Sequence, residues 1–80
     1  MDIGEAVRLR ILELCREYHI TVNKLSTICG VTQSTINNII SGRNKSATVS
    51  TVKKICDGLD ISILDFFHSK LFENLDQEIK

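Results

Sequence analysis

Residues 21–42, which read TVNKLSTICGVTQSTINNIISG, decide the fold of this 80-residue chain. Thr21 and Thr32 can each cap a helix, because a threonine hydroxyl accepts a hydrogen bond from a free backbone N–H group. Gly30 lies between them and can adopt the left-handed conformation that ends a helix. The stretch therefore predicts two short helices, at about 22–29 and 33–41, joined by a tight turn.

The second of these helices has two unlike sides. Ile36 and Ile39 lie on one side, and polar residues occupy the other: Gln33, Ser34, Asn37 and Asn38. Amide and hydroxyl groups both donate and accept hydrogen bonds, which suits the base edges of a DNA major groove. Asparagine is a poor helix former, so two adjacent asparagines within a helix favour a binding role. A solvated polar face is the alternative interpretation.

Apolar residues outside this stretch recur at the spacing of helices. A first helix is expected at about 4–18, opened by a capping box from Asp2 to Glu5. Thr48 is expected to cap a helix at about 49–58, and Ser62 with Asp65 to open a fifth helix. The expected inner face of the fourth helix consists of Val49, Val52, Ile55, Cys56 and Leu59. Since no segment alternates with period two, we expect an all-α domain of five helices.

Charged residues are distributed unevenly, although the net charge is zero. Residues 1–17 carry three basic and four acidic side chains, and residues 57–80 carry two basic and six acidic ones. Residues 18–56 carry five basic side chains and no acidic one, so the three regional sums are −1, +5 and −4. Because each carboxylate would repel phosphate, this acid-free stretch is typical of a surface that faces nucleic acid.

Other functional classes find little support in the sequence. Cys15, Cys29 and Cys56 have no C-x-x-C spacing and no histidine at ligand spacing, so we expect reduced thiols, no metal and no cofactor. The chain has no glycine-rich phosphate loop and no nucleophile–base pattern, so we expect no enzyme activity. No run reaches the ~20 apolar residues of a membrane span, and no signal peptide is visible. We therefore expect a cytoplasmic protein that does not enter a membrane.

Several sequence segments in and between these expected helices resemble those of the Cro/phage-repressor, or Xre, family of helix-turn-helix domains. The resemblance rests on residues 29–36 (CGVTQSTI), 41–43 (SGR), 49–56 (VSTVKKIC) and 59–62 (LDIS), and covers about residues 5–68. It implies a five-helix repressor-like domain at 1–68, with the helix-turn-helix unit at 21–42 and a tail at 69–80. It also implies a sequence-specific regulator of transcription, a repressor, that binds double-stranded DNA operators as a homodimer.

The same resemblance implies residue roles. The helix that begins at Gln33 is expected to lie in the major groove, with Gln33, Ser34 and Asn38 at the base-reading positions and Asn37 beside them. The residues expected on the DNA backbone are Thr32, Thr35, Arg43, Asn44 and Lys45. Some members of the family carry a buried Arg–carboxylate pair between helices 1 and 3, and the matching positions are Cys15 and Ile40.

The tail continues the apolar pattern of the fifth helix. Residues 63, 67, 71, 75 and 79 are apolar at successive i+4 positions, which predicts either an extended fifth helix or a further one. A dimer contact is expected at Phe67, Leu71, Phe72, Leu75 and Ile79. The alternative to a DNA-binding regulator is a protein-interaction module, such as an antitoxin or an adaptor, that binds a protein partner.

Overall fold

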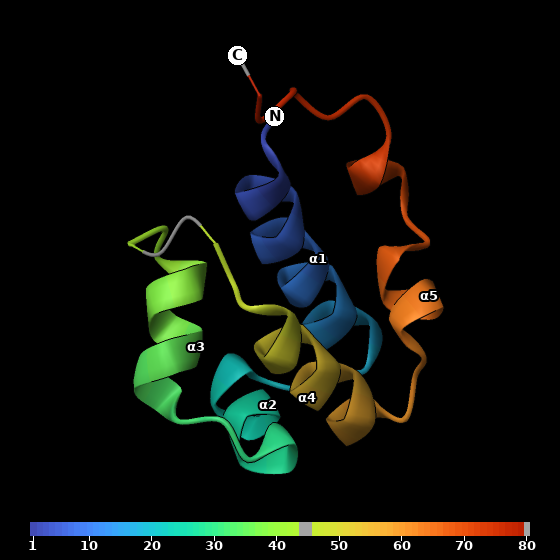
Figure 1. Ribbon diagram of the computed structural model, residues 1–80. Coiled ribbons are helices and arrows are strands. Elements are labelled where there is room, and N and C mark those ends of the chain that lie inside the picture. The colour runs from blue at the N-terminus through green and yellow to red at the C-terminus, as the bar shows by residue number, and fades with distance from the viewer. Residues whose placement is uncertain (44–45, 80) are drawn as a thin grey trace.

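A computed structural model describes residues 1–43 and 46–79 of the chain. Within that part, five α-helices are followed by one short 3-10 turn (Figure 1), and no strand is present. The elements are α1 (Ile3–Glu17), α2 (Val22–Cys29), α3 (Gln33–Ile40), α4 (Val49–Leu59), α5 (Ile63–Phe67) and the 3-10 turn η1 (Lys70–Phe72). The expectation of an all-α, five-helix domain is confirmed.

The helices begin where the sequence predicts. Each α-helix has an N-cap side chain that accepts a hydrogen bond from the backbone N–H three residues later, and the caps are Asp2, Thr21, Thr32, Thr48 and Ser62. The capping box of α5 is complete, because the Asp65 carboxylate also accepts from the Ser62 N–H. At α1, the Glu5 carboxylate accepts from Arg8.

The core forms where the apolar faces of the helices meet. In Figure 1, α1 stands at the centre, α3 lies on the left, α5 lies on the right, and α2 and α4 close the lower end. The buried cluster consists of Val7, Ile11, Leu14, Cys15, Leu25, Ile36, Ile39, Val52, Ile55, Cys56, Leu59 and Phe66. Burial of such side chains is the main favourable term in folding.

One expected core residue is not buried. Val49 opens α4 and its side chain is 80% exposed, so its assignment to the inner face of α4 was wrong. The periodicity places Val49 one turn before Val52 and Lys53, but the first turn of α4 extends past the end of the core. The remaining four residues of that expected face are buried.

The tail does not extend α5 as an α-helix. α5 ends at Phe67, and after two residues the chain forms η1, so the i+4 apolar residues do not lie along one helix. Phe72 packs against the core, and its ring centroid lies 4.8 Å from that of Phe67 and 6.3 Å from that of Phe66. The apolar spacing of the tail therefore reflects packing within the chain as well as an exposed end at Ile79, which is 87% exposed.

A buried arginine links α1 to α5. The Arg10 Nε atom donates to the Phe66 carbonyl at 2.6 Å, and Nη2 donates to the Asp65 carbonyl at 2.8 Å. Arg10 also pairs with Glu13, whose carboxylate accepts from the Ser69 hydroxyl at 3.4 Å. Cys15 and Ile40 stand at the positions where some family members carry a buried arginine pair, whereas Arg10, which the sequence did not single out, donates to the last carbonyls of α5.

The two ends of the described chain meet beside α1. The Asp76 N–H donates to the Met1 carbonyl at 3.0 Å, and the Asp76 carboxylate lies 3.6 Å from the Met1 amino group. Among the described residues, no helix is both long enough and apolar enough to cross a membrane.

Candidate nucleic-acid interface

The helix-turn-helix unit is formed by α2, the turn at residues 30–32, and α3. Gly30 takes a φ of 67°, which lets the chain leave α2 and reach Thr32 within two residues. The Thr32 hydroxyl accepts from the Thr35 N–H at 3.2 Å and lies 2.9 Å from the Thr35 hydroxyl. The two hydroxyls that the sequence assigned to the DNA backbone are therefore held together at the N-terminus of α3.

The position of α3 is set by its inner side. Ile36 is fully buried and Ile39 is 4% exposed, so both anchor α3 in the core. Leu25 and Ser26 of α2 are buried beside them, and the Ser26 hydroxyl donates to the Asn23 carbonyl at 2.7 Å. Because its small side chain is satisfied within its own helix, Ser26 allows close packing without leaving a buried polar group unpaired.

The outer side of α3 presents the polar residues that the sequence singled out. Gln33, Ser34 and Asn37 are exposed, and Asn38 is half-buried. At 100° per residue, Ser34 and Asn37 lie nearly opposite the two buried isoleucines, and Ser41 at the C-cap continues the same line. The structure therefore places Gln33, Ser34 and Asn37 on one exposed face, with Asn38 at its half-buried edge and Ser41 at the end of the helix.

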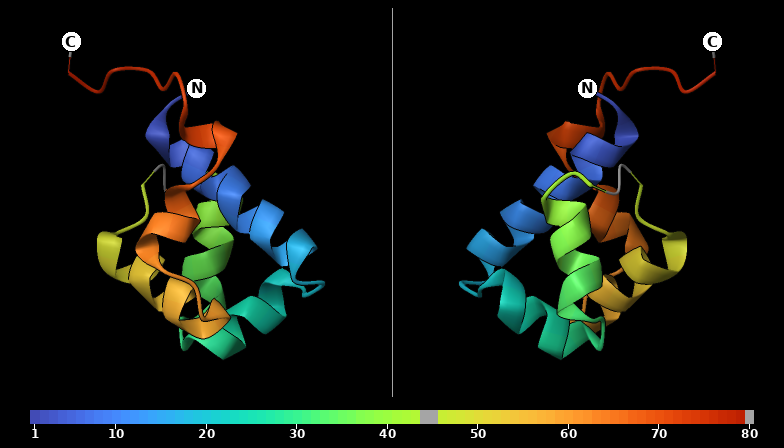
Figure 2. Two further views of the ribbon diagram at one scale, coloured as in Figure 1. Left: turned by 90° about the vertical axis from the view of Figure 1, so that its right-hand side faces the viewer. Right: turned by 90° about the vertical axis from the view of Figure 1, so that its left-hand side faces the viewer.

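Two other helices begin on either side of α3. Viewed onto α3, as in the right panel of Figure 2, α3 stands in the centre, with the start of α2 on one side and the start of α4 on the other. Neither these two helices nor α3 has an acidic residue in the first turn, whereas α1 and α5 carry Glu5 and Asp65 there. Free N–H groups and the helix dipole leave partial positive charge at these N-termini, which suits phosphate.

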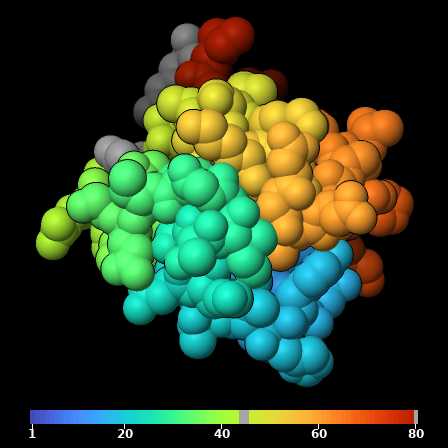
Figure 3. Space-filling model, turned by 90° about the horizontal axis from the view of Figure 1, so that it is seen from below, coloured from blue at the N-terminus to red at the C-terminus, as the bar shows by residue number. Residues whose placement is uncertain are grey.

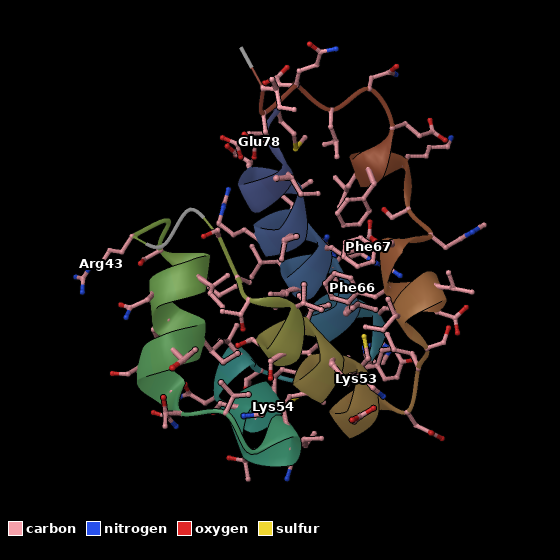
Figure 4. The ribbon with its side chains drawn as sticks, in the orientation of Figure 1. Arg43, Lys53, Lys54, Phe66, Phe67 and Glu78 are labelled. Atoms are coloured by element: carbon pink, nitrogen blue, oxygen red, sulfur yellow. The ribbon has the colours of Figure 1, made fainter. Side chains whose placement is uncertain are left out.

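The acid-free stretch places cations on α2, after α3 and on α4. Arg43 is exposed and extends outward from the end of α3 (Figure 4). Lys53 forms an ion pair with Asp57, and this hydrogen bond raises the pKa of Lys53. Within residues 18–43 and 46–56, the other cations, Lys24, Arg43 and Lys54, form no ion pair. Asn44 and Lys45, also expected on the DNA backbone, lie outside the described residues.

The close packing of α2 against α4 depends on one glycine. α2 contacts both α3 and α4, and it lies between them on the lower face of the molecule (Figure 3). A Cβ atom at Gly58 would lie 2.8 Å from the Cys29 Sγ atom and 3.1 Å from the Cys29 Cα atom. The sequence gives no direct signal for this contact, because Gly58 falls within an ordinary helical pattern.

The three cysteines behave as small apolar side chains. Burial raises the pKa of Cys15 and Cys56, and it raises the pKa of Cys29 to about 11. All three are free thiols, and within residues 1–43 and 46–79 no cluster of histidine, cysteine or acidic residues could hold a metal ion. These thiols therefore stay protonated at neutral pH and contribute to the core.

The fold and this face together define a helix-turn-helix DNA-binding domain. Residues 10–69 match the Cro/C1-type HTH DNA-binding domain family. The chain belongs to that family, as its resemblance to phage repressors led us to expect. The family binds DNA and is not a class of enzyme, which agrees with the absence of a catalytic pattern in the sequence.

Two relatives match most of the chain. The chain is 30% identical over 71 residues to the SPbeta prophage-derived uncharacterized HTH-type transcriptional regulator YopS of Bacillus subtilis (strain 168), covering 89% of this chain and 92% of that protein. The structure of the present chain is similar to the crystal structure of the prophage Lp1 protein 11, with a TM-score of 0.78 and 38% sequence identity. The match covers 86% of this chain and 92% of that one.

Proposed function

We propose that this protein is a sequence-specific regulator of transcription that inserts α3 into the major groove of an operator. One observation carries the proposal: the polar outer face of α3 is exposed, while buried isoleucines fix the helix in the core. Gln33, Ser34, Asn37 and Asn38 read base edges in this arrangement. The relative named as a transcriptional regulator supports the regulatory role.

The surroundings of α3 support contacts to the DNA backbone on both sides of the groove. Thr32 and Thr35 lie at the N-terminus of α3, and Arg43 extends from its other end. Together with Asn44 and Lys45, these residues hold the phosphate backbone and so fix the register in which α3 meets the bases. The protein represses by occupying the operator, and it does so in the cytoplasm, where the DNA is.

Two copies bind neighbouring half-sites as a homodimer. The proposed dimer contact is narrower than the sequence suggested, because Phe72 packs against Phe66 and Phe67 of its own chain. Leu71 and Leu75 are half-buried and Ile79 is exposed, so the end of the tail is the part left for a second copy.

Selection of DNA from a random double-stranded pool tests this function. The full chain should enrich a two-fold symmetric motif whose half-sites lie about one helical turn apart. The matched control is a protein in which Gln33, Ser34, Asn37 and Asn38 are all alanine, since these side chains lie outside the core. Enrichment of the same motif by the control, or no motif with the folded natural chain, would reject α3 as the reading element. A single half-site would reject the dimer alone.

A further inference from the structure

α5 lies on the side of α1 away from α3 (Figure 1), and its most exposed apolar side chain is Leu64. Leu64 is 82% exposed, and His68 lies one helical turn later on the same side of α5. An exposed leucine alone is ordinary on a protein surface, but other residues of α5 line two clefts. We call Leu64 and these two clefts the α5 surface.

The two clefts share His68. The first has a volume of about 290 Å³ and lies between α1 and α5, where Leu14, Tyr18, Ile61 and Asp65 line it. The second, of about 480 Å³, lies between α5 and η1, and Phe67 and Phe72 supply its apolar wall. Tyr18 and Phe67 are 41% and 38% exposed, so both clefts offer aromatic area to an incoming side chain.

The α5 surface is acidic. Glu17 and Asp65 line the first cleft, and Glu73 lines the second, against a single cation at Lys70. Arg10 also lines the first cleft, but it pairs with Glu13 and donates to two backbone carbonyls. Three carboxylates and one ammonium therefore give the lining of the two clefts a net charge of −2, with the Arg10–Glu13 ion pair left out.

We propose that the α5 surface binds a basic, amphipathic segment of a different protein. Apolar side chains of that segment contact Leu64 and fill the two clefts, and its lysines or arginines lie over Glu17, Asp65 and Glu73. A second copy of this chain fits less well, because two-fold pairing would bring the same carboxylates together. Since α5 and α3 lie on opposite sides of α1, the partner binds while α3 is on DNA (Figure 2).

A pair of synthetic peptides tests the proposal on the full-length protein. Each peptide has about 18 residues with leucine at positions i, i+3, i+4 and i+7, and the flanking residues are lysine in one peptide and glutamate in the other. Titrations followed by amide chemical shifts and by calorimetry should show the lysine peptide binding at least ~10-fold more tightly. The shifts should centre on Tyr18, Leu64 and Phe67.

Three variants sharpen the test. Leu64→Ser should weaken binding of the lysine peptide by ~10-fold, because it removes the central apolar contact. Val49→Ser removes an equally exposed side chain from the first turn of α4, outside both clefts, and should leave peptide binding unchanged. A chain carrying Glu17→Lys and Glu73→Lys should reverse the preference, so that the glutamate peptide binds more tightly.

The outcomes separate this proposal from its competitors. Equal binding of the two peptides, no binding of either, or shifts centred away from α5 would overturn it. A dimer seen by sedimentation that Leu64→Ser dissociates would also overturn it, since the occupant would then be a second copy. Operator affinity measured on monomeric half-sites should be unaffected by Leu64→Ser, so failure of this proposal leaves the proposed DNA binding intact.

Discussion

Asn37 and Asn38 are neighbours on α3, yet the structure exposes them differently. Asn37 lies on the outward line of the helix and is exposed, whereas Asn38 is half-buried at the edge of that face. An amide at the edge of the face has less conformational freedom to lose when it pairs with a base. Both side chains fit base reading, and each should be tested separately.

Asn38→Ala should weaken binding to the selected operator by about 1–3 kcal/mol and leave non-specific DNA binding nearly unchanged. The reason is that a bidentate base contact distinguishes sequences, whereas phosphate contacts do not. Titrations of operator and of scrambled DNA at one salt concentration measure both effects. Gln77→Ala, at an exposed residue of the tail, serves as the control. An equal loss on both DNAs would make Asn38 a backbone contact.

Gly58→Ala should destabilise the protein by about 1–3 kcal/mol, despite the better helix propensity of alanine. The added methyl group would meet the Cys29 Sγ atom and the α2 backbone, so α2 must move away from α4. Urea unfolding measures the change. A companion variant, Gly58→Ala with Cys29→Ala, should recover part of the loss by removing the sulfur. A gain in stability from Gly58→Ala alone would show that the two helices separate at no cost.

At the scale of elements, local chemistry was more predictable than packing. Thr21, Thr32, Thr48 and Ser62 could be identified as caps because a cap depends on a few neighbouring residues. The polar face of α3 could be predicted from the spacing of its isoleucines. The role of Gly58 could not, because the approach of α4 to α2 is set by the tertiary fold.

The failed predictions have the same origin. Periodicity alone made Val49 a core residue, but only the fold shows that the core ends before the first turn of α4. The i+4 spacing of the tail predicted an extended or a further helix, but α5 ends at Phe67 and the chain forms the short 3-10 turn η1, from which Phe72 packs on Phe66 and Phe67. Arg10 gave no sequence signal, since its partners are backbone carbonyls 55 and 56 residues away.

Arg10→Met should destabilise the protein by about 2–4 kcal/mol, because it leaves the buried Phe66 carbonyl without its donor and removes one of the donors to the Asp65 carbonyl and to the Glu13 carboxylate. Arg10→Lys should recover little, since a single ammonium cannot reproduce the planar fork of the guanidinium. Urea unfolding gives the stability, and hydrogen exchange should locate the loosening in α5. Full recovery by lysine would show that charge alone matters at this position.

At the scale of the whole molecule, the tail belongs to the fold as well as to any dimer. Ser69 bonds to Glu13, Phe72 packs on the core, and Asp76 meets Met1. Removal of the tail therefore acts on stability first, and it is a poor test of dimerisation. The two roles must be separated by substitutions that act on one of them.

Phe72→Ala should lower the free energy of unfolding by about 2–4 kcal/mol, because it removes a partly buried aromatic ring. Ile79→Ser should leave stability unchanged, since its side chain is 87% exposed, but should weaken the homodimer on a two-half-site operator. Unfolding and operator titrations on one and two half-sites measure these effects. Loss of stability from Ile79→Ser, or no loss of stability from Phe72→Ala, would contradict the assignment of Phe72 to the fold and of Ile79 to the dimer contact.

The charge distribution of the molecule predicts a strong salt dependence. Log K for operator binding should fall against log salt with a slope of about −3 to −5 per copy, at ~0.9 per neutralised phosphate. Arg43→Gln should reduce the slope by about 1. Titrations between low and moderate salt measure both slopes. A slope near zero would mean that the acid-free stretch does not face phosphate.

The two sides of α3 also bear on how such a protein changes its target. Folding depends on Ile36 and Ile39, whereas the proposed recognition depends on side chains that lie outside the core. Substitutions on the outer side therefore carry almost no thermodynamic penalty, and mutation can explore them one at a time. A lineage can adopt a new operator without passing through an unstable ancestor, and grafting another outer face onto this scaffold should retarget it.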